Sequence, residues 1–111
     1  MEEISFQVQG SSSTPYLVTF QKDGTNLNAS CTCAAGQNGQ YCKHRISILV
    51  DGSTQGVVSE NADEVAVVHS WLPGTDVEAA LSELAEAERQ LEAMKKAVTA
   101  LKKKVANALK T

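Results

Sequence analysis

Aromatic side chains, long apolar runs and basic charge are all scarce in this chain of 111 residues. Only five residues are Phe, Tyr or Trp, and the formal net charge is −3 at pH 7. A core with so few aromatic side chains is marginal by itself, because small domains bury a modest share of their surface. No run of about 18 apolar residues occurs, so we expect no transmembrane helix. The acidic start, Met-Glu-Glu-Ile-Ser, also lacks the basic and apolar parts of a signal peptide.

Cysteine is equally sparse, and its placement disfavours a disulfide framework. All three cysteines lie within a 14-residue window that ends at His44, in the pattern Cys-x-Cys, eight residues, Cys-x-His. A disulfide would leave one thiol unpaired, whereas three thiols and one imidazole form a complete tetrahedral ligand set for Zn²⁺. The pattern therefore predicts one structural Zn²⁺ per chain, bound by Cys31, Cys33, Cys42 and His44. Thiols that serve as reduced ligands fit a cytoplasmic location.

The segment between the two ligand pairs predicts a turn. It contains Gly36 and Gly39, and both glycines are free to take positive φ, so that Cys42 and His44 can return toward the first pair. Catalysis by Cys42 with His44 as base would need a third orienting group, and none is evident. Thiol–disulfide exchange normally uses Cys-x-x-Cys in a βαβ context, which is absent. We therefore expect no enzymatic activity.

The ligands and their flanks resemble the SWIM-type zinc finger, whose pattern is Cys-x-Cys, a variable spacer and Cys-x-His. The resemblance covers roughly residues 4–52, and all four ligand positions match. It implies a short β-hairpin that leads into a metal knuckle and then a helix. It also implies a DNA- or protein-binding module. SWIM modules are named from Swi/Snf-type ATPases and Mutator-type transposases, whereas we expect a small stand-alone protein here, so the family's functions do not transfer directly.

The N-terminal residues, 1–52, favour a small β-hairpin or ββα module. Apolar and polar residues alternate over 4–9, and 16–20 is a second strand-like run. An Asp-Gly turn at 23–24 precedes a third candidate strand over 26–32, which would deliver the first two ligands. Residues 43–50 indicate a short helix that stops at Asp51-Gly52. The predicted fold class is α+β.

Residues 53–74 are expected to be a linker with a short helix. Asn61 and Glu64 resemble an N-cap and its N3 partner, which predicts a helix from about 62 to 72. Pro73-Gly74 would end it. His69 lies within this helix, and we leave it outside the metal site because a lone helical histidine is commonly a surface residue.

Residues 75–111 predict one long helix. Thr75 and Glu78 form a capping box, and no Pro or Gly follows them. A helix of about 34 residues would be about 50 Å long. Its apolar residues repeat as a heptad, at Val77, Leu84, Leu91, Val98 and Val105 (a) and at Ala80, Ala87, Met94, Leu101 and Ala108 (d). So narrow an apolar stripe predicts a coiled coil, that is, association with another helix.

Charge is segregated along this helix. Six acidic residues lie between positions 76 and 92, and six lysines lie between 93 and 111. An antiparallel homodimer through residues 77–108, with Leu91 of one chain opposite Met94 of the other, would face Glu83 with Lys104 and Glu88 with Lys95. A parallel pair would instead bring Glu83 near Glu88. We expect the antiparallel homodimer. The alternatives are a different helical partner and packing back on the finger.

The partner is expected to be a protein. Residues 1–75 contain three basic and seven acidic residues, and three thiolates on Zn²⁺ add a further negative charge. Because non-specific DNA affinity comes largely from phosphate neutralisation, such a finger is poorly suited to it. Lys43 and Arg45 are its clustered bases. We therefore predict a zinc-binding, non-enzymatic adaptor. The alternative is a DNA- or RNA-binding accessory or regulatory protein, for example an inhibitor or recruiter of a larger nucleic-acid machine.

Overall fold

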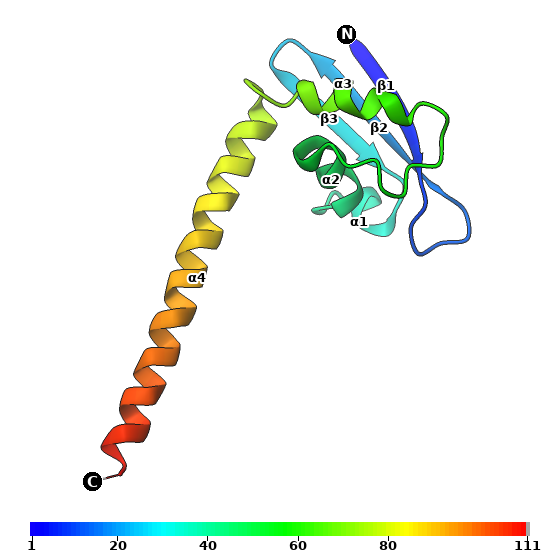
Figure 1. Cartoon of the computed structure of the whole chain (residues 1–111). Helices are drawn as coiled ribbons and strands as arrows, with labels where there is room; N and C mark the ends of the chain where they lie inside the picture. Colours follow the sequence, from blue (N-terminus) through cyan, green and yellow to red (C-terminus); the bar gives the residue numbers. More distant parts are fainter. Residues whose placement is uncertain (111) are drawn as a thin grey trace. The chain divides into compact units, whose positions relative to one another are not determined.

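The computed structural model describes residues 1–110 and confirms the predicted α+β class (Figure 1). Three strands form an antiparallel sheet in the order β1-β2-β3. The chain divides into two compact units, 1–78 and the remainder from 79 onward. The elements are β1 (Glu2–Val8), β2 (Tyr16–Asp23), β3 (Asn26–Cys31), α1 (Ala34–Gln37), α2 (Lys43–Asp51), the 3₁₀ helix η1 (Ala62–Glu64), α3 (Val65–Ser70) and α4 (Asp76–Ala108).

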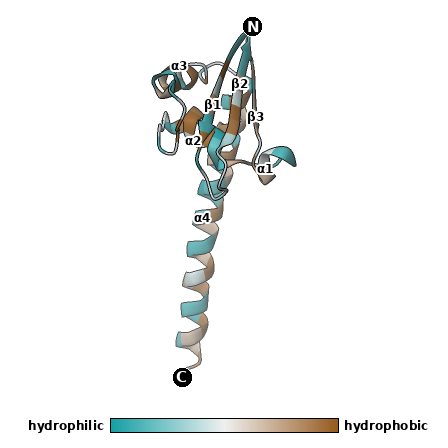
Figure 2. Ribbon diagram, turned by 90° about the vertical axis from the view of Figure 1, so that its right-hand side faces the viewer, coloured by the Kyte–Doolittle hydropathy of each residue, from teal (hydrophilic) through white to brown (hydrophobic). Residues whose placement is uncertain are grey.

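The strand alternation gives the sheet one apolar face and one polar face. The register sets Phe6 opposite Val18, and Val18 opposite Cys31, and all three side chains are buried. Phe6 also meets Phe20 edge-on, with ring centroids 6.0 Å apart. Helices α2 and α3 cover this face in both ribbon views (Figures 1 and 2). The first metal ligand, Cys31, therefore ends β3 on the buried side of the sheet.

Residues 53–74 are part of the folded core, although we expected a linker there. Val65, Val68 and Trp71 are buried in the same cluster as the strand residues. Val57 forms an antiparallel bridge to Val8 of β1. The first unit is consequently larger than the predicted 1–52 module, and its core includes helix α3.

The helix predicted over 62–72 is shorter and is capped differently. It consists of η1 followed by α3, and Asn61 makes no side-chain cap hydrogen bond. The Asn61 side-chain amide instead donates to the Ser5 carbonyl at 2.8 Å. Asn61 therefore occupies the predicted N-cap position, but its side chain does not cap the helix, because it binds strand β1 instead.

Both outer edges of the sheet are covered in part. On β3, the Leu27 amide donates to the Asp76 carboxylate at 3.2 Å, and the Asp76 amide donates to the Thr25 carbonyl at 3.2 Å. On β1, the Val58 amide donates to the Gln7 carbonyl at 2.8 Å. Covered edges resist pairing with strands of other molecules, so association through the sheet is disfavoured.

Helix α4 begins at the predicted capping box. The Glu78 amide donates to Thr75 Oγ1 at 3.3 Å, and the Glu78 carboxylate accepts from the Gly74 amide at 3.0 Å. The capping box predicts that the Glu78 carboxylate accepts from the Thr75 amide. In the structure it accepts from the preceding amide, that of Gly74. Val77 packs half-buried against the core of the first unit. The predicted segment 75–111 extends to Thr111, which lies outside the described residues.

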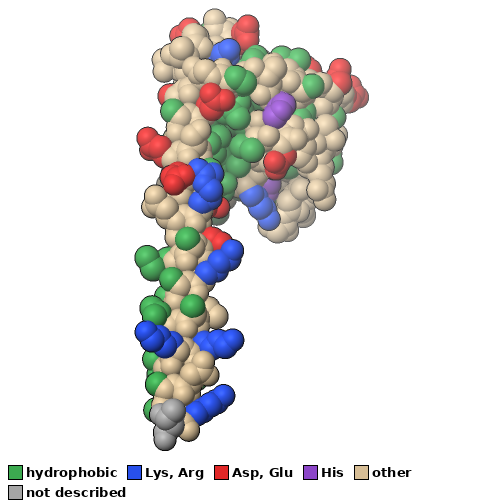
Figure 3. Space-filling view, turned by 60° about the vertical axis from the view of Figure 1, so that its left-hand side comes forward, with side chains coloured by type: hydrophobic (Ala, Val, Ile, Leu, Met, Phe, Trp, Pro, Cys, Tyr) green, Lys and Arg blue, Asp and Glu red, His purple; other side chains and the backbone are tan. Residues whose placement is uncertain are grey.

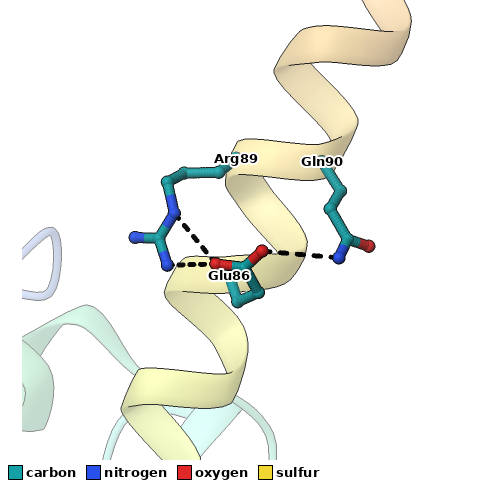
Figure 4. A network of polar contacts seen from close by, with 3 residues as sticks. All are labelled: Glu86, Arg89 and Gln90. Carbon is teal, nitrogen blue, oxygen red and sulfur yellow. Dashed lines mark hydrogen bonds and ion pairs between the residues drawn. The ribbon is translucent and has the colours of Figure 1, made fainter.

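Beyond its first turn, α4 alternates hydrophilic and hydrophobic residues (Figure 2). Glu86 pairs with Arg89 on the exposed surface and accepts from the Gln90 amide at 3.5 Å (Figure 4). Such exposed pairs contribute about 0.2–0.5 kcal/mol to a helix. No helix among the described residues is both long enough and apolar enough to cross a membrane.

Candidate metal centre

The structure brings together all four residues predicted to bind the metal. Cys31 ends β3, Cys33 is the N-cap of α1, Cys42 is the N-cap of α2, and His44 lies in the first turn of α2. Their ligand atoms all lie within 4.8 Å of one another. The two ligand pairs thus converge because the knuckle and α2 return the chain to the end of β3.

The distances in this Cys₃His cluster fit tetrahedral zinc. With Zn–S near 2.3 Å and Zn–N near 2.0–2.1 Å, ligand atoms are about 3.8 Å apart for two sulfurs and about 3.6 Å for sulfur and nitrogen. His44 Nδ1 lies 3.8 Å from Cys31 Sγ and 3.6 Å from Cys42 Sγ. Cys33 Sγ and Cys42 Sγ are 3.3 Å apart, closer than two zinc-bound sulfurs, so these two thiols would move apart by about 0.5 Å on binding the metal; no disulfide joins the cysteines. The cluster fits a single structural Zn²⁺ with His44 binding through Nδ1.

The electrostatics of the cluster favour a cation. The three cysteines are only 4%, 6% and 2% exposed, in chain order. Burial raises the pKa of the Cys31 thiol to about 12. Burial also disfavours the Cys42 thiolate, but the Arg45 amide and the Cys33, His44 and Cys31 side chains outweigh it and lower the pKa of Cys42 to about 6. Three adjacent buried thiols cannot readily ionise together, and a bound divalent cation removes this penalty.

Gly36 allows the knuckle to approach strand β3. Its amide donates to Cys33 Sγ at 3.3 Å. A Cβ at this position would lie 2.3 Å from the Cys31 carbonyl oxygen and 2.8 Å from Cys31 Cβ. The prediction of positive φ is wrong for Gly36, which lies within helix α1, and right for Gly39, which has φ of 69°. Glycine is required at position 36 because the backbone there approaches Cys31 too closely for a side chain.

The loop after β1 closes over the imidazole. The Tyr16 and His44 ring centroids are 5.0 Å apart. A Cβ at Gly10 would lie 2.5 Å from the Tyr16 ring and 3.1 Å from His44 Nε2. Tyr16 and Gly10 thereby hold the imidazole with Nδ1 toward the sulfurs. The sequence indicated only that Tyr16 begins a strand-like run, since contact with His44 depends on the fold.

Arg45 binds two backbone carbonyls beside the cluster. Its guanidinium donates to the Ala29 carbonyl of β3 at 3.0 Å and to the Gln40 carbonyl at 2.6 Å. It therefore ties α2 to the strand and to the end of the knuckle. Of the two clustered bases in the finger, Lys43 remains exposed, whereas Arg45 is used within the fold. No sequence signal distinguished the two.

Replacing Arg45 by alanine should destabilise the zinc-loaded protein by about 2–3 kcal/mol. A hydrogen bond to a charged group contributes about 1.5–3 kcal/mol, and of the two that Arg45 makes, the one to Gln40 is exposed to solvent and adds little. Urea unfolding followed by Trp71 fluorescence measures this loss. Lys43→Ala, at an exposed neighbour, is the control and should change the free energy of unfolding by no more than about 0.5 kcal/mol. Equal effects of the two substitutions would contradict the role given to Arg45.

His69 lies outside the cluster, as expected. Its Nδ1 is 2.7 Å from the Leu49 carbonyl near the end of α2, and its ring contacts the position of Gly52, the left-handed C-cap of that helix. This histidine therefore satisfies a carbonyl that a helix C-terminus leaves without an intrahelical partner.

A closed set of three buried thiols and one half-buried imidazole defines a structural zinc-binding module. Comparison with protein families identifies it further: residues 16–51 match the SWIM zinc finger family, and this segment is a SWIM zinc finger. The match runs from the start of β2 to the end of α2 and contains all four ligands. No curated protein and no solved structure matches the chain.

Proposed function

We propose that the protein is a non-enzymatic adaptor, in which the zinc finger unit offers a rigid protein-binding surface and α4 joins it to another helix. The exposed apolar stripe of α4 carries this proposal. Leu84, Leu91 and Leu101 are 39%, 55% and 60% exposed. A continuous apolar stripe of this kind on a polar surface is typical of a protein interaction site.

The chemistry of the finger supports a non-enzymatic role. The three thiols and the imidazole that would serve as nucleophile or base all converge on one point. Four protein ligands saturate tetrahedral Zn²⁺, so no coordination position remains for a substrate or an activated water. The metal then acts by stabilising the fold. Reduced thiolate ligands are consistent with a cytoplasmic location, where thiols are kept reduced.

The charges support a protein partner over nucleic acid. The finger is acidic, and Arg45 is bound to carbonyls of its own backbone. The six lysines of the C-terminal half of the chain are the feature that most favours phosphate binding. In an antiparallel pairing of α4, two of them face acidic residues, which reduces their availability.

A titration at two salt concentrations tests the choice between protein and nucleic acid. The zinc-loaded chain is added to fluorescent duplex DNA and single-stranded RNA of about 20 nucleotides, at about 50 and 200 mM salt. The adaptor predicts no saturable binding below about 100 μM, the weak end of non-specific DNA affinity. Micromolar binding that falls steeply with salt, and that is lost in Lys102→Gln/Lys103→Gln/Lys104→Gln, would establish the nucleic-acid alternative.

A further inference from the structure

Helix α4 exposes an apolar seam that is shorter than the sequence predicted. Met94, Val98 and Val105 are 64%, 45% and 61% exposed, as part of the same stripe as the leucines. Figure 3 shows hydrophobic side chains in a line along α4, with lysines on its C-terminal half. Val77 does not belong to this seam, because it packs against the finger core. The seam is Ala80, Leu84, Ala87, Leu91, Met94, Val98, Leu101 and Val105.

We propose that this seam binds a second copy of the chain, antiparallel, in the one register that sets Leu91 opposite Met94 of the second copy. The proposal rests on the helical association proposed above and specifies its partner. An antiparallel pair with this register has a two-fold axis between Leu91 and Met94, so each contact occurs twice. Each copy carries its finger unit at the N-terminal end of its own α4, so the helix pair joins two finger units.

Side-chain volume favours this arrangement. With Leu91 opposite Met94, Leu84 faces Leu101, and the two alanines of the seam each face a valine. The alanine layers are Ala87 with Val98 and Ala80 with Val105. A parallel pair would instead stack alanine on alanine and leucine on leucine, which alternates voids with bulky layers. Interiors pack to a uniform density, so layers that match small with large side chains are preferred.

Charge favours it as well. In this register Glu88 flanks Lys95 of the second copy, and Glu83 flanks Lys104, which gives four attractive pairs by symmetry. A parallel pair would place Glu83 beside Glu88 on both sides and would offer no acid–lysine pair in compensation. Each exposed pair contributes at most about 1 kcal/mol, but pairs that flank the seam decide orientation between otherwise similar alternatives.

The two antiparallel registers that differ from the proposed one by a shift of one heptad are disfavoured by Glu88 and Lys95. A shift of one heptad in one direction sets Glu88 against Glu88 of the second copy. A shift in the other direction sets Lys95 against Lys95 and keeps only two attractive pairs, Glu88 with Lys102, in place of four. Both shifts also shorten the overlap of the seam. Repulsion in the wrong registers makes the proposed one specific, because specificity is a difference in affinity between alternatives.

Sedimentation equilibrium of the zinc-loaded full chain tests the association. The expected result is a dimer at about 100 μM. Leu91→Asp should give a monomer that keeps its zinc and its finger fold, since Leu91 is exposed and lies outside the first unit. A wild-type monomer at that concentration would overturn the proposal and leave the finger and the protein-binding role untouched.

Charge reversal tests the orientation and register. Glu88→Lys and Lys95→Glu should each weaken dimerisation about 10- to 50-fold, and the double variant should restore it, because two attractive pairs become repulsive and then attractive again. Glu92→Lys makes the same change on the outward side of the helix and is the control. If Glu88→Lys tightens the dimer, the helices are parallel and the proposal is wrong. If the double variant is as weak as the single ones, the register is wrong.

Discussion

Replacing Cys42 by alanine should release the zinc and unfold residues 1–78. Structural zinc contributes on the order of 10 kcal/mol of apparent binding free energy in finger peptides, whereas a small domain has about 5–15 kcal/mol of total stability. The Cys42 thiol is 2% exposed and approaches both Cys33 and His44. Its loss removes one of four ligands and leaves two neighbouring thiols with no cation to hold their charge.

Metal content and Trp71 fluorescence measure the outcome of this substitution. Trp71 is 6% exposed in the core of the first unit, so its emission should shift to that of a solvent-exposed indole. Circular dichroism alone is a poor reporter, because α4 contributes most of the helical signal. Tyr41→Ala, beside Cys42 but 64% exposed, is the control and should keep the zinc and the buried indole. A folded, zinc-free Cys42→Ala protein would refute a structural role for the metal.

The metal ligands were predictable from the sequence because their chemistry depends on residue type and local spacing. Three thiols and one imidazole within a short window already complete the ligand set of a tetrahedral zinc site. The start of α4 was predictable for the same reason, since the capping box uses neighbouring residues. The alternation of apolar and polar residues over 4–9 likewise predicted strand β1, because a period of two is a local signal that needs no knowledge of the partner strand.

The residues that surround the metal were less predictable, because their roles depend on the tertiary fold. Asn61 carried an N-cap signal, yet its side chain binds the Ser5 carbonyl, 56 positions away in the chain. Arg45 was indistinguishable from Lys43 until Ala29 and Gln40 were placed beside it. The core role of α3 escaped detection because three apolar residues in a short helix are compatible with both a linker and a core.

In the proposed dimer, stabilisation and association belong to different parts of the chain. The zinc holds the knuckle against the sheet, and covered strand edges limit pairing of one finger with another through the backbone. A continuous stripe of exposed apolar residues lies instead on α4, beyond the first unit. A substitution in the seam should therefore change assembly without releasing the metal, and a substitution in the Cys₃His cluster should unfold the finger first.

Gly36→Ala should weaken zinc binding and destabilise the first unit by about 3 kcal/mol or more, although alanine is the better helix former. In an ordinary helix this change stabilises by about 1 kcal/mol. Here the new Cβ would lie 2.3 Å from the Cys31 carbonyl oxygen, well inside contact distance. The clash cannot be relieved by a small shift, because Cys31 is fixed as a ligand and Gly36 itself lies between two further ligands, Cys33 and Cys42.

Zinc competition with a chromogenic chelator and urea unfolding together measure the effect of Gly36→Ala. The matched control is Gly39→Ala in the same knuckle. Gly39 has φ of 69° and open space around its Cβ position, so alanine there should cost only the strain of a left-handed residue, about 1–2 kcal/mol. We expect Gly36→Ala to lose more stability and more zinc affinity than Gly39→Ala. A Gly36→Ala protein more stable than the wild type would mean that helix propensity, and not close approach to Cys31, governs this position.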